Sequence, residues 1–397
     1  MTSSSPQTSG RIYFDNAATS WPKPPEVVQA ITNFYNNVGT AAGRGNQASE
    51  YSSDSISQKC RSELLDFIGG RAGDRNASDQ IVFAFNGTDA INMGLFGFLN
   101  RGDHVVTTAI EHNSVLRPLE LLKQNLDVKV SVVECGEDGT IDPDDIKNAI
   151  VSKTKLVVIS HASNVTGVIQ DVEGIGKLCQ ELDVTLMLDA AQTVGQIPID
   201  VQTIGCHMLA AAGHKGLLGP LGTGFLYLSK DTAPQMRPWR AGGTGTSSEL
   251  SSQPSDYPAR LESGNLNLGG IAGMRAGLEF VKTIGVEKIQ QHKRKLIAQV
   301  ISQLADHPKI KFYCQDNLDR AGVISMNIAD SDPRELAMIL DSSFGIQTRA
   351  GFHCAPKMHH TLKTIDQGGT LRISPGWFST EPEIDRFVEA IKEISSL

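Results

Sequence analysis

Two residues of opposite charge each stand at the end of an apolar run. Lys215 follows the run 209–212 and precedes a glycine-rich turn, and no other lysine or arginine lies within 209–224. Desolvation among such small residues lowers the pKa of an ammonium group, because burial penalises the charged form. A neutral amine is what a Schiff base with an aldehyde cofactor requires. Taken alone, the stretch would better suit an exposed lysine on a glycine loop.

The second residue, Asp189, ends the run Val184-Thr-Leu-Met-Leu188. A continuous apolar run is typical of a strand in a parallel sheet that is covered on both faces. Open α/β sheets bind ligands at the C-terminal ends of such strands. A buried carboxylate needs a cationic partner, and the protonated ring nitrogen of pyridoxal phosphate would be one. Asp189 and Lys215 are therefore predicted to be the two fixed points of a pyridoxal phosphate site.

A third reactive group is Cys354, which follows Gly-Phe-His and precedes Ala-Pro, a composition typical of a loop. Arg349 or a protonated His353 nearby would favour its thiolate. The residue could be an ordinary free cysteine, a nucleophile that accepts sulfur, or a metal ligand together with His353, His359 and His360. A closed metal site needs four ligands in tetrahedral array, which adjacent residues of one short loop provide poorly.

Three motifs occur in a fixed order: Asp189-Ala-Ala-Gln192, Gly213-His-Lys-Gly216 and Arg349-Ala-Gly-Phe-His-Cys-Ala355. Together they resemble the class V aminotransferase family of pyridoxal-phosphate enzymes, and the cysteine desulfurases in particular. The resemblance extends from about Tyr13 to the C-terminus. It implies an α/β fold of the PLP-dependent transferase type I, with a large domain built on a mixed, mostly parallel seven-stranded sheet and a smaller α+β domain. The implied division is a disordered tail at 1–11, an N-terminal segment of the small domain at 12–35, the large domain at 36–268 and the small domain at 269–397.

The resemblance also implies how the cofactor would be bound. Gly87 and Thr88 lie at a strand-to-helix junction, where free amides at the helix N-terminus bind phosphate. Thr88 could instead simply cap the helix. Ala212 stands where the family usually has a serine or threonine whose hydroxyl binds phosphate, and His214 would compensate. His112 would stack on the pyridine ring and shuttle protons.

Four more roles follow from the resemblance alone. Asn164 and Gln192 would contact the phenolic oxygen of the cofactor, although either residue could be a turn-former. Arg372 would bind the substrate carboxylate as a bidentate fork, with Asn164 beside it. A surface salt bridge is the alternative for Arg372. Asn265 would reach the phosphate in the other subunit of a homodimer.

The implied reaction converts L-cysteine, or an analogue, to L-alanine and leaves a persulfide on Cys354, from which a sulfur-acceptor protein would take it. Lys215 would act as the general acid and base. Three alternatives remain: a selenocysteine lyase or other C–S lyase, an aminotransferase, and a scaffold without catalytic activity. Weak dependence on Cys354 would favour another lyase, and lack of bound cofactor would favour the scaffold.

Composition sets broader limits on these hypotheses. A chain of 397 residues is long enough for two domains. Its net charge of -8 gives no reason to expect nucleic acid or an anionic membrane as a partner. No apolar run approaches the roughly 20 residues of a membrane helix, and the serine-rich residues 1–10 do not resemble a signal peptide. Six scattered cysteines suggest no disulfide framework, so we expect a reducing cytoplasm.

Hydrophobic patterns predict elements that alternate as the resemblance requires. The expected strands are 80–85, 104–108, 128–133, 155–160, 184–188, 310–314, 322–328 and 369–374. The expected helices are near 25–34, 50–67, 142–150, 274–281, 286–304, 333–341 and 382–396.

Overall fold

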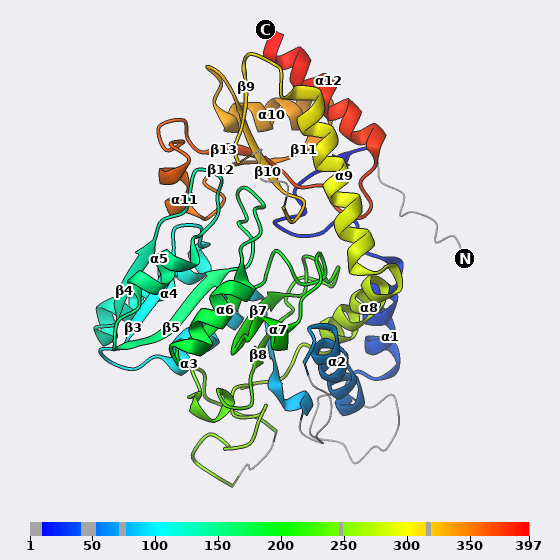
Figure 1. The fold of residues 1–397 in the computed structure, drawn as a ribbon. Coiled ribbons are helices and arrows are strands. Elements are labelled where there is room, and N and C mark those ends of the chain that lie inside the picture. Colours follow the sequence, from blue (N-terminus) through cyan, green and yellow to red (C-terminus); the bar gives the residue numbers. More distant parts are fainter. Residues whose placement is uncertain (1–9, 41–52, 71–76, 246–248, 315–318, 397) are drawn as a thin grey trace.

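The structure, a computed structural model, describes residues 10–40, 53–70, 77–245, 249–314 and 319–396. Most of the tail predicted at 1–11 lies outside these ranges, and so does part of residues 37–45, whose sequence predicts a loop. Two lobes are seen in Figure 1, a lower lobe built on a seven-stranded sheet and an upper lobe built on a four-stranded sheet. The fold therefore has the predicted large α/β unit and smaller α+β unit.

The seven-stranded sheet of the lower lobe has the strand order β2-β8-β7-β6-β5-β3-β4. Its strands are β2 (Ile81–Ala84), β3 (His104–Thr108), β4 (Lys129–Val133), β5 (Thr154–Ser160), β6 (Thr185–Asp189), β7 (Met208–Ala212) and β8 (Gly224–Leu228). Only β8 runs antiparallel to its neighbours, β2 and β7. The prediction of a mixed, mostly parallel sheet of seven strands is confirmed. β8 itself was not among the strands expected from the sequence.

Helices cover both faces of this sheet, which explains its continuously apolar strands. Successive strand residues alternate between two cores: Ile81 and Phe83 belong to one, and Val82 and Ala84 to the other. The helices beside the first core are α2 (Ser53–Phe67), α5 (Pro143–Ala149), α6 (Val172–Glu181), α7 (Val201–Ile204) and α8 (Leu268–Ile284). Those beside the second are α3 (Gly87–Phe98) and α4 (Asn113–Leu126).

The upper lobe contains an antiparallel sheet with the strand order β12-β13-β10-β9. Its strands are β9 (Ile310–Phe312), β10 (Ile324–Ile328), β12 (Arg349–Gly351) and β13 (Thr370–Ile373). A separate parallel pair joins β1 (Ile12–Tyr13) to β11 (Ile346–Gln347). The helices of this lobe are α9 (Val286–Leu304), α10 (Pro333–Phe344), α11 (Pro356–Thr361) and α12 (Glu381–Ser396). Short 3-10 turns lie at Ala77–Gln80 and Ala233–Gln235.

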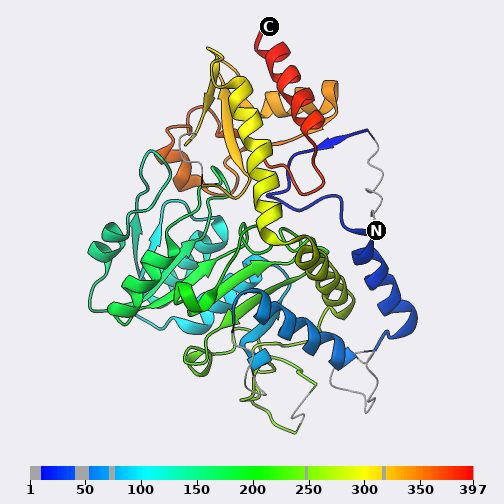
Figure 2. The same ribbon diagram turned by 45° about the vertical axis from the view of Figure 1, so that its right-hand side comes forward.

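The packing of the helices that connect the lobes can be compared with the domain boundary predicted at residue 268. Leu268, Ile271 and Met274 of α8 pack in the core of the large sheet, and α8 lies beside α1 (Pro25–Asn37) in both ribbon views (Figures 1 and 2). The C-terminal half of α9, by contrast, packs in the upper core through Leu296 and Val300. We propose that the small domain begins within α9, and that α1 belongs with the large one.

The N-terminal segment crosses from one lobe to the other. β1 lies in the upper lobe, and the blue trace then descends to α1 in the lower lobe (Figures 1 and 2). This path carries residues 14–24 past the boundary between the lobes.

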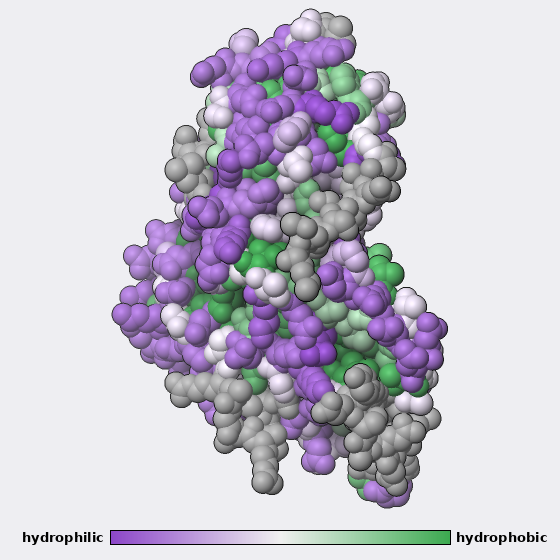
Figure 3. Space-filling model, turned by 90° about the vertical axis from the view of Figure 1, so that its right-hand side faces the viewer, coloured by the Kyte–Doolittle hydropathy of each residue, from purple (hydrophilic) through white to green (hydrophobic). Residues whose placement is uncertain are grey.

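The face that carries α1, α8 and α9 shows a mixed surface (Figure 3). Hydrophilic residues cover most of its upper lobe, while hydrophobic residues gather between the lobes and on the lower lobe. Among the described residues, no helix is both long enough and apolar enough to cross a membrane.

Candidate active site

A cavity of about 520 Å³ lies where the strand ends of the large sheet meet the small sheet. Such a volume suits a cofactor together with a small substrate. The predicted site residues that line it are Gly87, Thr88, His112, Asn164, Asp189, Gln192, His214, Lys215 and Arg372. Arg349 and His353 line it as well. The structure thus brings the three sequence motifs to one place.

Lys215 lies in the tight turn between β7 and β8. Gly213 is required there, because a Cβ on it would come within 2.3 Å of Thr223 Oγ1. Burial lowers the pKa of the Lys215 ammonium to about 8, and the charge of Asp189 acts in the opposite direction. Within the described part of the chain, its Nζ atom has no hydrogen-bond partner. This group is therefore an amine that is accessible in its neutral form near physiological pH.

Asp189 ends β6 and is buried. Its Oδ1 accepts one hydrogen bond, from the Ala191 amide at 3.0 Å. Burial raises the pKa of this carboxyl group, while that hydrogen bond and the charge of Lys215 lower it. A cation placed against the carboxylate would remove the penalty of burial, which is the requirement that predicted a protonated ring nitrogen here.

The N-terminus of α3 forms one end of the cavity. Asn86 caps this helix, because its side chain accepts from the Asp89 amide at 2.9 Å. The alternative role of Thr88 as the N-cap is therefore wrong. The backbone N–H groups of Gly87 and Thr88 lie in the first turn of α3, where no helix carbonyl four residues earlier can accept from them. They therefore remain available for an anion.

Opposite this helix end lie Ala212 and His214. The Ala212 methyl group is 3.6 Å from the position of a Cβ on Gly87, so a small apolar group stands where the family has a hydroxyl. Burial lowers the pKa of His214 to about 4, which leaves the imidazole neutral. Its Nδ1 atom is buried and has no partner among the described residues. That nitrogen can supply the hydrogen bond that Ala212 lacks.

His112 caps α4 through its Nδ1 atom, which accepts from the Ser114 amide at 3.0 Å. Because Nδ1 is an acceptor, the ring proton must be on Nε2. Burial, and then the charges of Lys215 and Arg349, lower the pKa of His112 to about 4. The ring is thus a neutral, flat donor on the cavity wall, as stacking on a cofactor would require. Its predicted proton shuttling can use only the Nε2–H group.

Two side-chain amides line the cavity and already make one hydrogen bond each. Gln192 Nε2 donates to the Ala17 carbonyl at 3.0 Å, and Gln192 Oε1 is buried with no partner in the described ranges. Asn164 Nδ2 donates to the His353 carbonyl at 2.6 Å. An amide nitrogen has two hydrogens, so each side chain keeps one for a ligand. Neither residue merely forms a turn.

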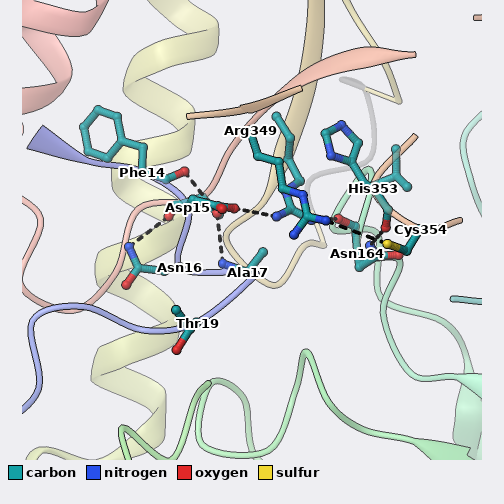
Figure 4. Close-up of polar contacts among 12 residues, drawn as sticks. Phe14, Asp15, Asn16, Ala17, Thr19, Asn164, Arg349, His353 and Cys354 are labelled. Carbon is teal, nitrogen blue, oxygen red and sulfur yellow. Dashed lines mark hydrogen bonds and ion pairs between the residues drawn. The ribbon is translucent and has the colours of Figure 1, made fainter. Parts of the chain in front are cut away.

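The guanidinium of Arg372 is only 1% exposed and is bound from two sides. Its Nη2 pairs with Asp15 Oδ1 at 2.6 Å, and its Nη1 donates to the Asn164 carbonyl at 2.9 Å. Figure 4 shows Asp15 on one side of this region and Asn164 and Cys354 on the other, with Arg349 between them. The alternative of a surface salt bridge is wrong for a side chain so buried.

Cys354 lies in a tight turn between β12 and α11. His353 and Cys354 have φ angles of 48° and 58°, in the left-handed region. The Asn113 amide fixes the turn by donating to the Cys354 carbonyl at 2.6 Å. Arg349 Nη2 lies 3.7 Å from the Cys354 sulfur (Figure 4). A cation next to the thiol is therefore present, and it is the arginine.

The expectation of a protonated His353 is wrong. Burial, with the charge of Arg372, holds the pKa of His353 well below its usual value. Its Nε2 atom lies 3.0 Å from the Thr370 carbonyl. The neighbouring His359 has its Nδ1 atom 2.7 Å from the Thr364 hydroxyl. In the described ranges, no three or more histidine, cysteine and acidic residues gather in a group that could hold a metal ion.

Asn265 does not lie at this site within its own protomer. It is exposed and lines a separate, small cavity with Gly222 and Arg240. Its predicted contact with a second subunit stays a prediction.

Comparison with known proteins places this geometry in a family. The sequence model of "Aminotransferase class-V" matches residues 12–387. The chain belongs to this family. The class V match covers both lobes and all the residues of the cavity.

Curated relatives in the class V family carry a more specific name. A "Probable cysteine desulfurase" of Methanothermobacter thermautotrophicus is 36% identical over 97% of this chain and 95% of that protein. A "Cysteine desulfurase" of Escherichia coli is 29% identical over 97% of this chain and 93% of that protein. Among solved structures, the apo cysteine desulfurase of Thermococcus onnurineus has a TM-score of 0.87 and 31% identity, covering 97% of this chain and 95% of that one.

The sequence did not predict a role for Glu111, a buried acid next to His112. Glu111 accepts from the Thr108 hydroxyl at 2.6 Å and from the Ser160 amide at 2.9 Å. It therefore ties the end of β3 to the end of β5, next to His112. Burial raises the pKa of Glu111 to about 7 despite these hydrogen bonds. Its position directly before His112, after a strand, was the available signal.

The N-terminal segment makes a second set of contacts that the sequence did not predict. The His214 carbonyl accepts from the Ser20 amide at 3.0 Å, from the Thr19 hydroxyl at 3.2 Å and from Lys23 Nζ at 2.9 Å. The peptide that carries Lys215 is thus held by residues almost 200 positions away. No local pattern could have indicated this contact.

These features fit pyridoxal phosphate, the cofactor expected for the class V family. Free amides and an unpartnered imidazole nitrogen face one end of the cavity, and a buried carboxylate lies on its wall. Lys215, whose pKa is lowered to about 8, makes no side-chain hydrogen bond in the described part of the chain. The donor set thus offers groups for the phosphate, the ring and the aldehyde.

Proposed function

We propose that this protein is a cysteine desulfurase that binds pyridoxal phosphate and releases sulfur from L-cysteine as a persulfide on Cys354. The observation that carries the proposal is a reactive amine in the cavity with a reactive thiol in the turn beside it. The amine of Lys215 has no protein partner, and the thiol of Cys354 lies 3.7 Å from the Arg349 guanidinium in the turn beside that cavity. Desulfurase relatives of similar length support it.

The residues that would hold the cofactor are those of the large lobe. Gly87, Thr88 and His214 would bind its phosphate, Asp189 its ring nitrogen, and Lys215 would carry it. When bound, pyridoxal phosphate supplies an electron sink for the bonds at the substrate Cα and Cβ atoms. His112 would cover one face of the ring with its flat, neutral imidazole.

The substrate would be oriented by Arg372 of the small lobe and by groups of the large lobe beside it. Arg372 would bind the α-carboxylate of L-cysteine, with Asn164 alongside. The amine of Lys215, neutral above a pH of about 8, would accept the proton from the substrate Cα and return a proton to the product.

The sulfur transfer would use Cys354 as the nucleophile. Its thiolate attacks the substrate sulfur, so that an S–S bond forms as the substrate Cβ–S bond breaks. The electron pair of that bond ends at Cβ, which takes up a proton. L-Cysteine and the Cys354 thiol thus give L-alanine and a persulfide, with no external oxidant. Arg349 would stabilise the thiolate before the attack.

The proposal is tested by incubating the cofactor-loaded protein with L-cysteine, with and without a thiol reductant, and measuring L-alanine and sulfide. We expect one alanine per active site without reductant and repeated turnover with it. Formation of 3-mercaptopyruvate, the 2-oxo acid of L-cysteine, with a pyridoxamine form of the cofactor would indicate an aminotransferase. Absence of any product from cofactor-loaded protein would contradict the proposal.

We further propose a homodimer with shared sites, and a sulfur-acceptor protein as the physiological partner in a reducing cytoplasm. The exposed position of Asn265, away from the cavity of its own protomer, supports reach toward a second subunit. All six cysteines are free, which supports a reducing compartment. Light scattering during gel filtration tests the dimer, and an elution mass of about one chain would contradict it.

A further inference from the structure

The ion pair between Asp15 and Arg372 joins the N-terminal segment to the small-lobe side of the cavity, which Arg372 lines. Its N–O distance is 2.6 Å, and the two side chains are 19% and 1% exposed. Burial lowers the pKa of Arg372, and the nearby positive charge of Arg349 lowers it further, whereas Asp15 raises it. Asp15 therefore neutralises the more buried of two adjacent guanidinium groups.

The backbone of Asp15 is held firmly in place. Its carbonyl accepts from the Ala18 amide at 3.1 Å, and Asp15 forms a parallel bridge with Ser374. The next residues are bound as well, since the Ala17 amide donates to the Ser374 hydroxyl at 3.0 Å. Figure 4 shows these links around Asp15, Asn16 and Ala17. These contacts fix the backbone position from which the Asp15 carboxylate reaches Arg372.

Arg372 is already paired with one anion before a second one arrives. One terminal nitrogen donates to Asp15 and the other to the Asn164 carbonyl, and the Nε atom is buried without a partner among the described residues. An amino-acid carboxylate that binds Arg372 must therefore share it with Asp15. Two carboxylates around one guanidinium repel each other, so the second binds more weakly than it would to an unpaired arginine.

We propose that Asp15 is a positioning residue that shares the Arg372 guanidinium with the amino-acid carboxylate and thereby keeps the affinity for substrate and product low. This inference rests on the proposed role of Arg372 in binding the substrate. Low affinity has a use here, because the L-alanine product carries the same α-carboxylate as L-cysteine. Sharing of the guanidinium lets the product leave.

The test is the Kd of L-alanine for the cofactor-loaded protein, measured by calorimetry for the wild type and for Asp15→Asn. Asparagine has the same shape and keeps the backbone contacts, but it leaves Arg372 buried and unpaired until a carboxylate arrives. We expect L-alanine to bind about tenfold more tightly to this variant, and propionate to show the same trend. In turnover, KM for L-cysteine and the inhibition constant of L-alanine both fall, and kcat falls because release slows.

The control is Asp341→Asn. Asp341 pairs with Arg11 at the same distance of 2.6 Å, but the side chains of Arg11 and Asp341 are 47% and 44% exposed. This variant should leave the Kd of L-alanine unchanged. Asp15→Glu, which keeps the charge, should restore weak binding. If Asp15→Asn does not fold, Asp15→Ser is measured in the same way.

An unchanged or higher Kd in Asp15→Asn would overturn the inference. If Asp15 only orients Arg372, its loss weakens the binding of L-alanine. If Asp15 competes with the ligand carboxylate for Arg372, its loss strengthens that binding. Arg372→Gln should abolish the difference between Asp15 and its variant. The binding measurement needs no turnover. If the wild type binds L-alanine but does not desulfurate L-cysteine, the proposed function fails while the role of Asp15 is still decided.

Discussion

The two walls of the cavity satisfy their polar groups in different ways. On the large-sheet wall, His214 Nδ1 and Gln192 Oε1 are buried without a partner in the described part of the protein, and Lys215 Nζ makes no hydrogen bond there. On the small-sheet wall, the two terminal nitrogens of Arg372 are bound to Asp15 and Asn164, while Arg372 Nε and His353 Nδ1 have no partner among the described residues. The amine of the large-sheet wall thus makes no hydrogen bond, whereas the guanidinium of the small-sheet wall is already paired.

This difference matches the two kinds of ligand that the site would bind. A cofactor that stays through many turnovers can be the permanent partner of buried polar groups, whose desolvation would otherwise be costly. A substrate comes and goes, so the groups that bind it need protein partners of their own. We infer that the large-sheet wall is built for retention and the small-sheet wall for exchange.

The largest effect is expected at Cys354. Cys354→Ala should lower sulfide release from L-cysteine at least about a thousandfold, because the sulfur loses its acceptor. The variant should retain bound cofactor, since Cys354 does not line the cavity and lies in the turn beside its small-sheet wall. Cys314→Ala is the matched control, because Cys314 is the other partly exposed free cysteine and lies outside the cavity. Undiminished sulfide release from Cys354→Ala would favour another type of C–S lyase.

Arg372→Gln should reduce kcat/KM for L-cysteine roughly a hundredfold, mainly through KM, as loss of a charged carboxylate contact implies. Cofactor content, read from the absorbance of the purified protein, should be unaffected. A variant that loses its cofactor instead would break the division between the two walls. Arg275→Gln, which removes a pair with Glu63 remote from the cavity, is the control.

The pH dependence of cofactor binding tests the retention wall. Lys215 is protonated below its pKa of about 8 and neutral above it. Only the neutral amine reacts, so the rate at which apoprotein captures pyridoxal phosphate should rise about tenfold from pH 7 to above pH 9 and then level off. Asp189→Asn removes a charge that raises this pKa and should shift the midpoint below 8. A midpoint near the usual lysine value would contradict the burial of Lys215.

The smallest effect is expected at Ala212. Ala212→Ser restores the hydroxyl that the family usually has and should slow cofactor dissociation severalfold, which corresponds to one added hydrogen bond of about 1 kcal/mol. The rate is followed by the loss of bound cofactor on dilution. Ala211→Ser, one residue earlier on the same strand and on its other face, is the control. No change in Ala212→Ser would mean that His214 already supplies the full phosphate contact.

The sequence revealed the retention wall more completely than the exchange wall. Asp189 and Gly87 lie just after predicted strands and Lys215 just after the apolar run 209–212, and parallel strands bring their C-terminal ends to one edge. Such local signals sufficed for these residues. The alternative role of Thr88 as the cap of α3 was wrong, because Asn86, whose side chain can also cap, takes that place.

The exchange wall depends on contacts between distant parts of the chain. Asp15 and Arg372 are 357 positions apart, and Asn164 bonds to a residue 189 positions away. Nothing in either local segment specifies these pairs. The prediction of a protonated His353 was wrong for a similar reason, because burial by other elements lowers the pKa of this residue. The strand β8 was missed because a glycine-rich turn precedes its short apolar run.

The central claim is that Lys215 is the residue that joins the cofactor to the large-sheet wall. Borohydride reduction of the cofactor-loaded protein, followed by proteolysis and mass spectrometry, measures this directly. We expect one pyridoxyl group per chain on Lys215, and none on the buried Lys293 or on the partly buried Lys23. A modification found elsewhere, or an unmodified Lys215, would contradict the account.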